Sequence, residues 1–160
     1  MREKRRILGI DPGFGMVGYG LIDVDGNEEK ILEYGIIKTD PQASLSKRLV
    51  EIYEEISKLI KIYQPTESAV EELYFFRNVT TAIFVGEARG VIILALEEAK
   101  TIIYEYTPME VKMAVTGYGK ATKRQVQEMV RVILKMDKIP KPDDAADALA
   151  IAICHAHQIL

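Results

Sequence analysis

The sequence predicts an α/β fold in which helices cover both faces of one mixed five-stranded sheet. Two features predict it. Three apolar runs with the length and turn residues of strands open the chain, and two shorter apolar runs then alternate with segments of helical periodicity. Such alternation is typical of a sheet covered on both faces. A chain of 160 residues has the usual length of one domain, and we expect residues 1–160 to form a single domain.

Three strands are expected at the N-terminus. Ile7–Asp11 is an apolar run closed by Pro12-Gly13, Gly18–Val24 ends at the turn pair Asp25-Gly26, and Ile31–Thr39 is the third run. The turn residues lie directly after the first two runs, which indicates short connections between neighbouring strands. We therefore predict an antiparallel meander.

Helical periodicity begins after these strands. From Leu45 to Tyr63 apolar residues recur every three or four positions, and Ser44 is placed to cap that helix. Ser68–Glu71 has the pattern of a fourth strand. Thr80–Ala99 reads as a second long helix, with Gly86 and Gly90 on one face, so another backbone could approach it closely.

A fifth strand and three further helices complete the expected order. The next helix opens with a capping box and a proline suited to a first turn, and the one after it repeats the capping signature. The segments are a strand at Thr101–Tyr106, a helix opened by Thr107-Pro108-Met109-Glu110, a helix opened by Thr122 with Gln125, and a last helix from Asp143 or Asp144 to about His157.

Composition indicates a protein that stays in the cytoplasm. The single cysteine, Cys154, excludes an intramolecular disulfide, which suits a reducing compartment. We expect no signal peptide and no membrane partner, because no uninterrupted apolar run reaches the length needed to span a bilayer.

Charge is distributed unevenly along the chain. The net charge is −3, which alone argues against a nucleic-acid partner. Between Lys112 and Lys135, however, six basic residues stand against one acidic residue, Glu128. A metal-dependent nuclease needs both an acidic site for the metal and a cationic surface that attracts phosphate.

Two candidate metal ligands end predicted strands. Asp11 follows a run that we expect to be buried, where a bare carboxylate is costly unless a cation neutralises it. An equally good reading is that Asp11 begins a turn with Pro12-Gly13. Glu71 likewise ends an apolar strand, and its alternative is a solvated loop carboxylate.

Two further candidates, Asp144 and Asp147, lie three residues apart on one helix face. Asp143 and Asp144 also suit the first turn of a helix for reasons unrelated to metals. That explanation is weaker for Asp147, whose small apolar neighbours indicate a helix packed closely on a sheet.

Together these four carboxylates predict a metal site at one end of the sheet. Oxygen-only ligands select hard cations, so we expect Mg²⁺, with Mn²⁺ as a substitute. With two ions, one generates the attacking hydroxide and the other stabilises the leaving oxygen. The predicted chemistry is phosphodiester hydrolysis.

The motifs resemble those of the RuvC family of bacterial Holliday junction resolvases over nearly the whole chain. The resemblance implies a ribonuclease-H-like fold, Mg²⁺ dependence, a homodimer, and paired symmetrical nicks in four-way junction DNA during recombination and repair. It also implies work beside the RuvA and RuvB branch-migration proteins. The motifs are Gly9-Ile10-Asp11-Pro12-Gly13, Gly18-Tyr19-Gly20, Ala69-Val70-Glu71-Glu72, Gly86-Glu87-Ala88-Arg89-Gly90, Lys123-Arg124-Gln125-Val126-Gln127 and Asp144-Ala145-Ala146-Asp147-Ala148-Leu149-Ala150.

The resemblance also assigns roles to single residues. Asp11, Glu71, Asp144 and Asp147 match the family's acidic quartet. Lys112 and Lys123 match two lysines that contact DNA near the cut, where a cation can also offset charge in the transition state. We expect further DNA contacts from Lys120 and Arg124. Among the aromatics Tyr74, Phe75 and Phe76 we favour Tyr74 and Phe75 for stacking at the junction centre.

Some expectations rest on mechanism or stay open. Two symmetrical cuts call for a two-fold dimer, and the helix from Gly86 to Ala95 is the candidate interface. His155 and His157 point to different helix faces, so we expect no shared metal site, although one could lie near the acidic cluster. Three rivals stand beside the resolvase: an ATP-binding module of the actin and sugar-kinase type, another ribonuclease-H-like nuclease, and a DNA-binding protein without catalysis.

Overall fold

The computed structural model describes residues 3–73 and 77–158, and these ranges hold one five-stranded sheet in the order β3-β2-β1-β4-β5. The five strands predicted from the sequence are confirmed. The second and third strands are longer than predicted, because pairing continues through to a tight turn at Asn27. The strands are β1 (Arg5–Asp11), β2 (Met16–Asp25), β3 (Glu28–Lys38), β4 (Glu67–Glu71) and β5 (Ile102–Tyr106).

Strand pairing places the C-terminal ends of β1, β4 and β5 together at one end of the sheet. β1, β2 and β3 pair antiparallel, which confirms the predicted meander. β4 pairs parallel to β1 with Val70 beside Ile10, and β5 pairs parallel to β4 with Tyr106 beside Glu71. Because β1, β4 and β5 run in the same direction, Asp11 and Glu71, the last residues of β1 and β4, lie at the same end of the sheet.

The helices begin close to where the sequence predicts them. The capping boxes of Thr107 with Glu110 and of Thr122 with Gln125 are both present. Ser44 occupies the N-cap position of the first helix, but its side chain makes no capping hydrogen bond. The helices are α1 (Leu45–Tyr63), α2 (Val79–Glu98), α3 (Pro108–Thr116), α4 (Lys123–Ile133) and α5 (Asp143–Ala156).

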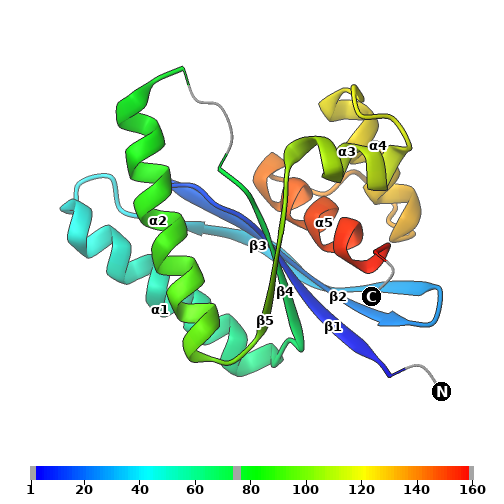
Figure 1. Ribbon diagram of the computed structural model, residues 1–160, viewed down its shortest axis with the longest axis horizontal. Helices are drawn as coiled ribbons and strands as arrows, with labels where there is room; N and C mark the ends of the chain where they lie inside the picture. The colour runs from blue at the N-terminus through cyan, green and yellow to red at the C-terminus, as the bar shows by residue number, and fades with distance from the viewer. Residues whose placement is uncertain (1–2, 74–76, 159–160) are drawn as a thin grey trace.

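Helices cover both faces of the sheet, as predicted (Figure 1). α1 and α2 pack on one face through an apolar cluster that includes Ile52, Ile56 and Ile92. α3, α4 and α5 pack on the other face, where Leu149 and Ile153 of α5 are fully buried. The sheet is thus the central layer of three, and most of the burial stabilising it is aliphatic.

Glycines in β1 and β2 allow α5 to lie directly on the sheet. A Cβ on Gly9 would overlap the carbonyl oxygen of Ala148, and a Cβ on Gly18 would overlap that of Asp144. A Cβ on Gly20 would press against the side chain of Leu149. Any larger residue at these positions would force the helix away from the strands. This contact fixes the distance between α5 and the end of β1.

α2 has one packed side and one exposed apolar side. By length and composition it could cross a membrane, but Ala88 and Ile92 pack it against the protein's own core. Its other side exposes Val79, Ile83 and Leu94 at 73%, 54% and 52%. The close backbone approach predicted at Gly86 and Gly90 does not occur among the described residues: a Cβ on Gly90 would meet nothing within 4 Å, and one on Gly86 only a Leu73 methyl at 3.8 Å.

Candidate active site

The structure brings the four predicted carboxylates to one end of the sheet. Asp11 and Glu71 are the last residues of β1 and β4, which are adjacent and parallel. Asp144 and Asp147 lie in the first two turns of α5, which crosses that end of the sheet. Two strand ends and one helix therefore fix the relative positions of all four.

Three of these carboxylates are close enough to share one cation. Asp11, Asp144 and Asp147 each offer an oxygen, and these oxygens all lie within 4.8 Å of one another. Glu71 lies outside that set but lines the same pocket as Asp147, which has a volume of about 240 Å³. The pocket is an open depression between α3, α4 and the start of α5, with room for a phosphate group.

Burial and mutual repulsion make this acidic cluster costly when no cation is present. Burial raises the pKa of Asp11 to about 8, with further contributions from the charges of Glu71, Asp147 and Asp144. Burial and the charge of Asp147 raise the pKa of Glu71 to about 7, against the opposing effect of Lys112 and Lys123. Carboxyl groups that resist ionisation in this way are typical of sites that bind cations or transfer protons.

A divalent cation fits these residues. All donors are carboxylate oxygens, the ligand type that Mg²⁺ and Mn²⁺ prefer. A bound cation would remove the repulsion that raises the pKa of Asp11 and would let the whole set ionise near neutral pH. The donor set and the perturbed pKa values thus point to the same occupant.

Lys123 supplies a cation inside the site. Its Nζ lies 3.4 Å from Oδ2 of Asp143 and 3.5 Å from Oδ2 of Asp147, and these carboxylates raise the pKa of the lysine. Lys112, on α3, lines the same pocket. Both predicted lysines therefore lie at the acidic cluster, each positioned by a helix that begins with a capping box.

Two contacts at the site could not be read from the sequence pattern. The guanidinium of Arg89, on α2, donates to the backbone carbonyl of Glu71 over 3.1 Å and pairs with Glu105 over 2.7 Å. Gln127 donates to Oδ1 of Asp143 over 3.1 Å and so ties α4 to the start of α5. Arg89 lies in the Gly86–Gly90 motif, but only the fold shows that it holds the end of β4.

The other predicted DNA-binding residues are more dispersed. Lys120 is exposed in the connection between α3 and α4, and Arg124 is exposed on α4, where it pairs with Glu128 over 3.5 Å. Lys135 turns away to pair with Glu28 over 3.6 Å. The basic segment is therefore not one continuous surface. The aromatics favoured for stacking, Tyr74 and Phe75, lie outside the described residues, as does Phe76.

Neither histidine belongs to the acidic site. His155 is fully buried at the far end of α5, where its Nδ1 bonds the hydroxyl of Tyr106 over 2.6 Å and its Nε2 contacts Glu67. His157 pairs with Glu29. The expectation that one of them could lie near the acidic cluster is wrong, because His155 is eight residues beyond Asp147 on α5, a rise of about 12 Å along the helix.

Comparison with known proteins gives matches over nearly the whole chain. The family model described as crossover junction endodeoxyribonuclease RuvC matches residues 7–155. A protein of that name from Petrotoga mobilis is 56% identical over 151 residues, which cover 94% of this chain and 93% of the relative.

Two solved structures from Thermus thermophilus resemble the fold closely. Its RuvC matches with a TM-score of 0.89 and 38% identity, covering 95% of this chain and 93% of the other. The same protein in complex with a Holliday junction substrate matches with a TM-score of 0.91 and 38% identity, covering 96% and 93%. This likeness confirms the predicted ribonuclease-H-like fold.

Proposed function

The chain belongs to the RuvC family of crossover junction endodeoxyribonucleases, and from that premise we propose that it resolves four-way (Holliday) junctions by paired symmetrical nicks. A family member of the same fold is known in complex with a Holliday junction substrate. The reaction is phosphodiester hydrolysis, and its setting is DNA recombination and repair.

The observation that carries this proposal is the convergence of Asp11, Asp144 and Asp147 within 4.8 Å, with Glu71 in the adjoining pocket. Asp11, Glu71, Asp144 and Asp147 are the proposed ligands of Mg²⁺, which Mn²⁺ could replace. When bound, a pair of such ions lowers the pKa of water and stabilises charge on the attacking and leaving oxygens.

The chain's own residues bind and orient the scissile phosphate. Lys123 and Lys112 line the pocket beside the carboxylates and attract the phosphate that the acidic cluster alone would repel. Lys123, held by Asp143 and Asp147, stays close to where negative charge develops during the reaction. Arg89 holds the end of β4 and so keeps the Glu71 carboxylate aimed at the site. Lys120 and Arg124 provide outer contacts to the DNA backbone.

A homodimer with its two-fold interface on α2 suits this reaction. Paired cuts need two identical sites, and an isologous dimer supplies them. The exposed side chains of Val79, Ile83 and Leu94 form an apolar stripe, and Gly86 and Gly90 leave room for a partner backbone. Burying this stripe in an interface would also explain why the exposed side of α2 is so apolar. Family membership supports action in the cytoplasm beside RuvA and RuvB.

The substrate preference can be tested directly. The wild-type protein is incubated in Mg²⁺ with a labelled four-way junction, a linear duplex of the same sequence and an RNA–DNA hybrid, and the products are mapped at nucleotide resolution. We expect symmetrical nicks in the junction and little cleavage of the other two substrates. Faster cutting of the hybrid would contradict the proposal and favour another ribonuclease-H-like nuclease. Cleavage of no substrate would favour a DNA-binding protein without catalysis.

A further inference from the structure

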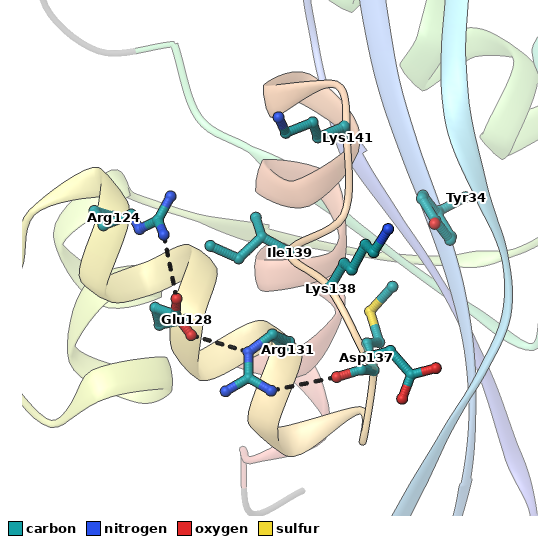
Figure 2. A pocket seen from close by; sticks show the side chains of 9 residues that line it. Tyr34, Arg124, Glu128, Arg131, Asp137, Lys138, Ile139 and Lys141 are labelled. Atoms are coloured by element: carbon teal, nitrogen blue, oxygen red, sulfur yellow. Dashed lines mark hydrogen bonds and ion pairs between the residues drawn. The ribbon is translucent and has the colours of Figure 1, made fainter.

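A second cleft lies on the same face of the sheet as the active site. It has a volume of about 960 Å³ and is bounded by α4, by the segment between α4 and α5, and by Tyr34 of β3 (Figure 2). Resting on the proposed function, we propose that this cleft binds the sugar–phosphate backbone of a junction arm next to the strand that is cut.

The charge of the cleft favours an anion. Its lining includes the basic side chains Arg124, Arg131, Lys138 and Lys141, against the acidic side chains Glu128 and Asp137. The whole chain carries a net charge of −3, so this excess of positive charge is local. Positive potential inside a concave surface is stronger than on a flat one, because the low-dielectric walls focus the field.

The internal ion pairs leave cationic groups available. Glu128 bonds both arginines, Arg131 over 2.9 Å and Arg124 over 3.5 Å, so one carboxylate is shared by two guanidinium groups. Lys138 and Lys141 are exposed, and within residues 3–73 and 77–158 neither pairs with a carboxylate. Figure 2 shows Lys138 extending toward Tyr34 across the cleft. Both lysines are therefore placed to meet a ligand.

The position of the cleft relative to the active site identifies DNA as the anion. Arg124 follows Lys123, which pairs with Asp147, and Lys141 is two residues before Asp143. One end of the cleft thus adjoins the catalytic carboxylates. From Arg124 to Arg131 α4 rises about 10 Å, which corresponds to roughly three nucleotides of one strand. A strand whose phosphate is held at the carboxylates can continue along this cleft.

The contacts expected here carry no sequence information. Lysine and arginine bind phosphate oxygens and fix the register of a duplex, but they do not read bases unless they enter a groove. Loss of these contacts should weaken binding to all sequences alike and reduce its dependence on salt.

The test compares Lys138→Gln/Lys141→Gln with wild type and with Lys58→Gln/Lys61→Gln, which removes the same charge from α1 on the opposite face. The dissociation constant for a four-way junction is measured in EDTA, without cleavage, at several salt concentrations and with two unrelated arm sequences. We expect the slope of log K against log salt to fall by about 1.8 and the Kd at 0.1 M salt to rise by one to two orders of magnitude. The α1 control should match wild type.

Three results would overturn the proposal: an unchanged slope, an equal loss in the α1 control, or unchanged junction binding together with altered self-association in sedimentation, which would make the cleft a protein contact. Circular dichroism of each variant checks that it is folded. Both lysines are exposed, so we expect the substitutions to leave the fold intact. If wild type failed to cut a junction in Mg²⁺, the proposed function would be wrong. The binding comparison in EDTA does not depend on cleavage and would still decide whether the cleft binds DNA.

Discussion

Gly18 of β2 lies directly against the backbone of Asp144 in the first turn of α5, so closely that a Cβ on residue 18 would overlap the carbonyl oxygen of Asp144. The same close packing recurs further along the helix, between Gly9 and Ala148. The glycines of two strands thereby set the distance between the carboxylates of α5 and the carboxylate of Asp11. Backbone packing, as well as the acidic side chains, determines the geometry of the site.

Gly18→Ala should damage catalysis more than it damages the fold. The added methyl group has to displace the first turn of α5. Overpacking of this kind costs about 1–3 kcal/mol of stability. A shift of about 1 Å at Asp144 and Asp147 should slow single-turnover junction cleavage by roughly 100-fold. Gly15→Ala is the matched control, because its Cβ would only contact Arg48 at 3.6 Å. Equal cleavage rates for the two variants would contradict this explanation.

Asp11→Asn should stabilise the metal-free protein at pH 8. Well below pH 3.8, the ordinary pKa of aspartate, Asp11 is protonated in both the folded and the unfolded chain, so its burial carries no charge penalty. As the pH rises toward the folded-state pKa of about 8, the unfolded chain loses that proton first and stability falls. In EDTA we expect the substitution to raise the free energy of unfolding by about 1–3 kcal/mol at pH 8 and by much less at pH 4. Urea denaturation at both pH values measures this, and a variant no more stable than wild type at pH 8 would argue against the cause assigned to the shift.

Cation affinity should rise with pH over the same range. A divalent ion has to displace protons from Asp11 and Glu71, whose pKa values are raised to about 8 and about 7. Titration with Mn²⁺, followed by electron paramagnetic resonance, should therefore give a dissociation constant that falls between pH 6 and pH 9. The pH dependence should be weaker in Asp11→Asn. An affinity independent of pH would mean that these carboxyl groups are already ionised in the metal-free protein.

Lys123→Gln should slow cleavage and move its pH dependence upward. The lysine lowers the pKa of both Glu71 and Asp147, so removing it should raise both values. We expect the single-turnover rate at pH 7.5 to fall roughly 10- to 1000-fold, with part of the loss recovered at higher pH. Lys135→Gln, which removes an ion pair of similar length to Glu28, is the control and should cleave as wild type does. A loss of rate with no change in the pH profile would limit Lys123 to binding DNA.

Much of the fold followed from local patterns in the sequence. Runs such as Ile7–Ile10 proved to be fully buried, and the helices opened by Thr107 and Thr122 begin at those caps. These features depend on neighbouring residues, which a single sequence displays. The strand order and the parallel pairing of β1 with β4 depend on contacts between residues far apart in the chain, and no local pattern specifies them.

Part of the candidate site could also be predicted from local patterns, and the part that depends on packing between distant segments could not. Asp144 and Asp147 are three apart in a helix, so their shared face could be read directly. Arg89 could not be placed, because its contact to the carbonyl of Glu71 depends on how α2 packs beside β4. Lys138 and Lys141 lie outside the basic segment recognised in the sequence, and only the turn between α4 and α5 brings them opposite Arg131.

The central claim is that the converging carboxylates perform the cleavage. It is tested most directly by incubating wild type and Asp147→Asn with a labelled four-way junction, in Mg²⁺ and in EDTA, and comparing single-turnover cleavage with binding. We predict symmetrical nicks by wild type in Mg²⁺ alone, and junction binding without detectable cleavage by Asp147→Asn. Cleavage by Asp147→Asn at the wild-type rate would contradict the role assigned to this site.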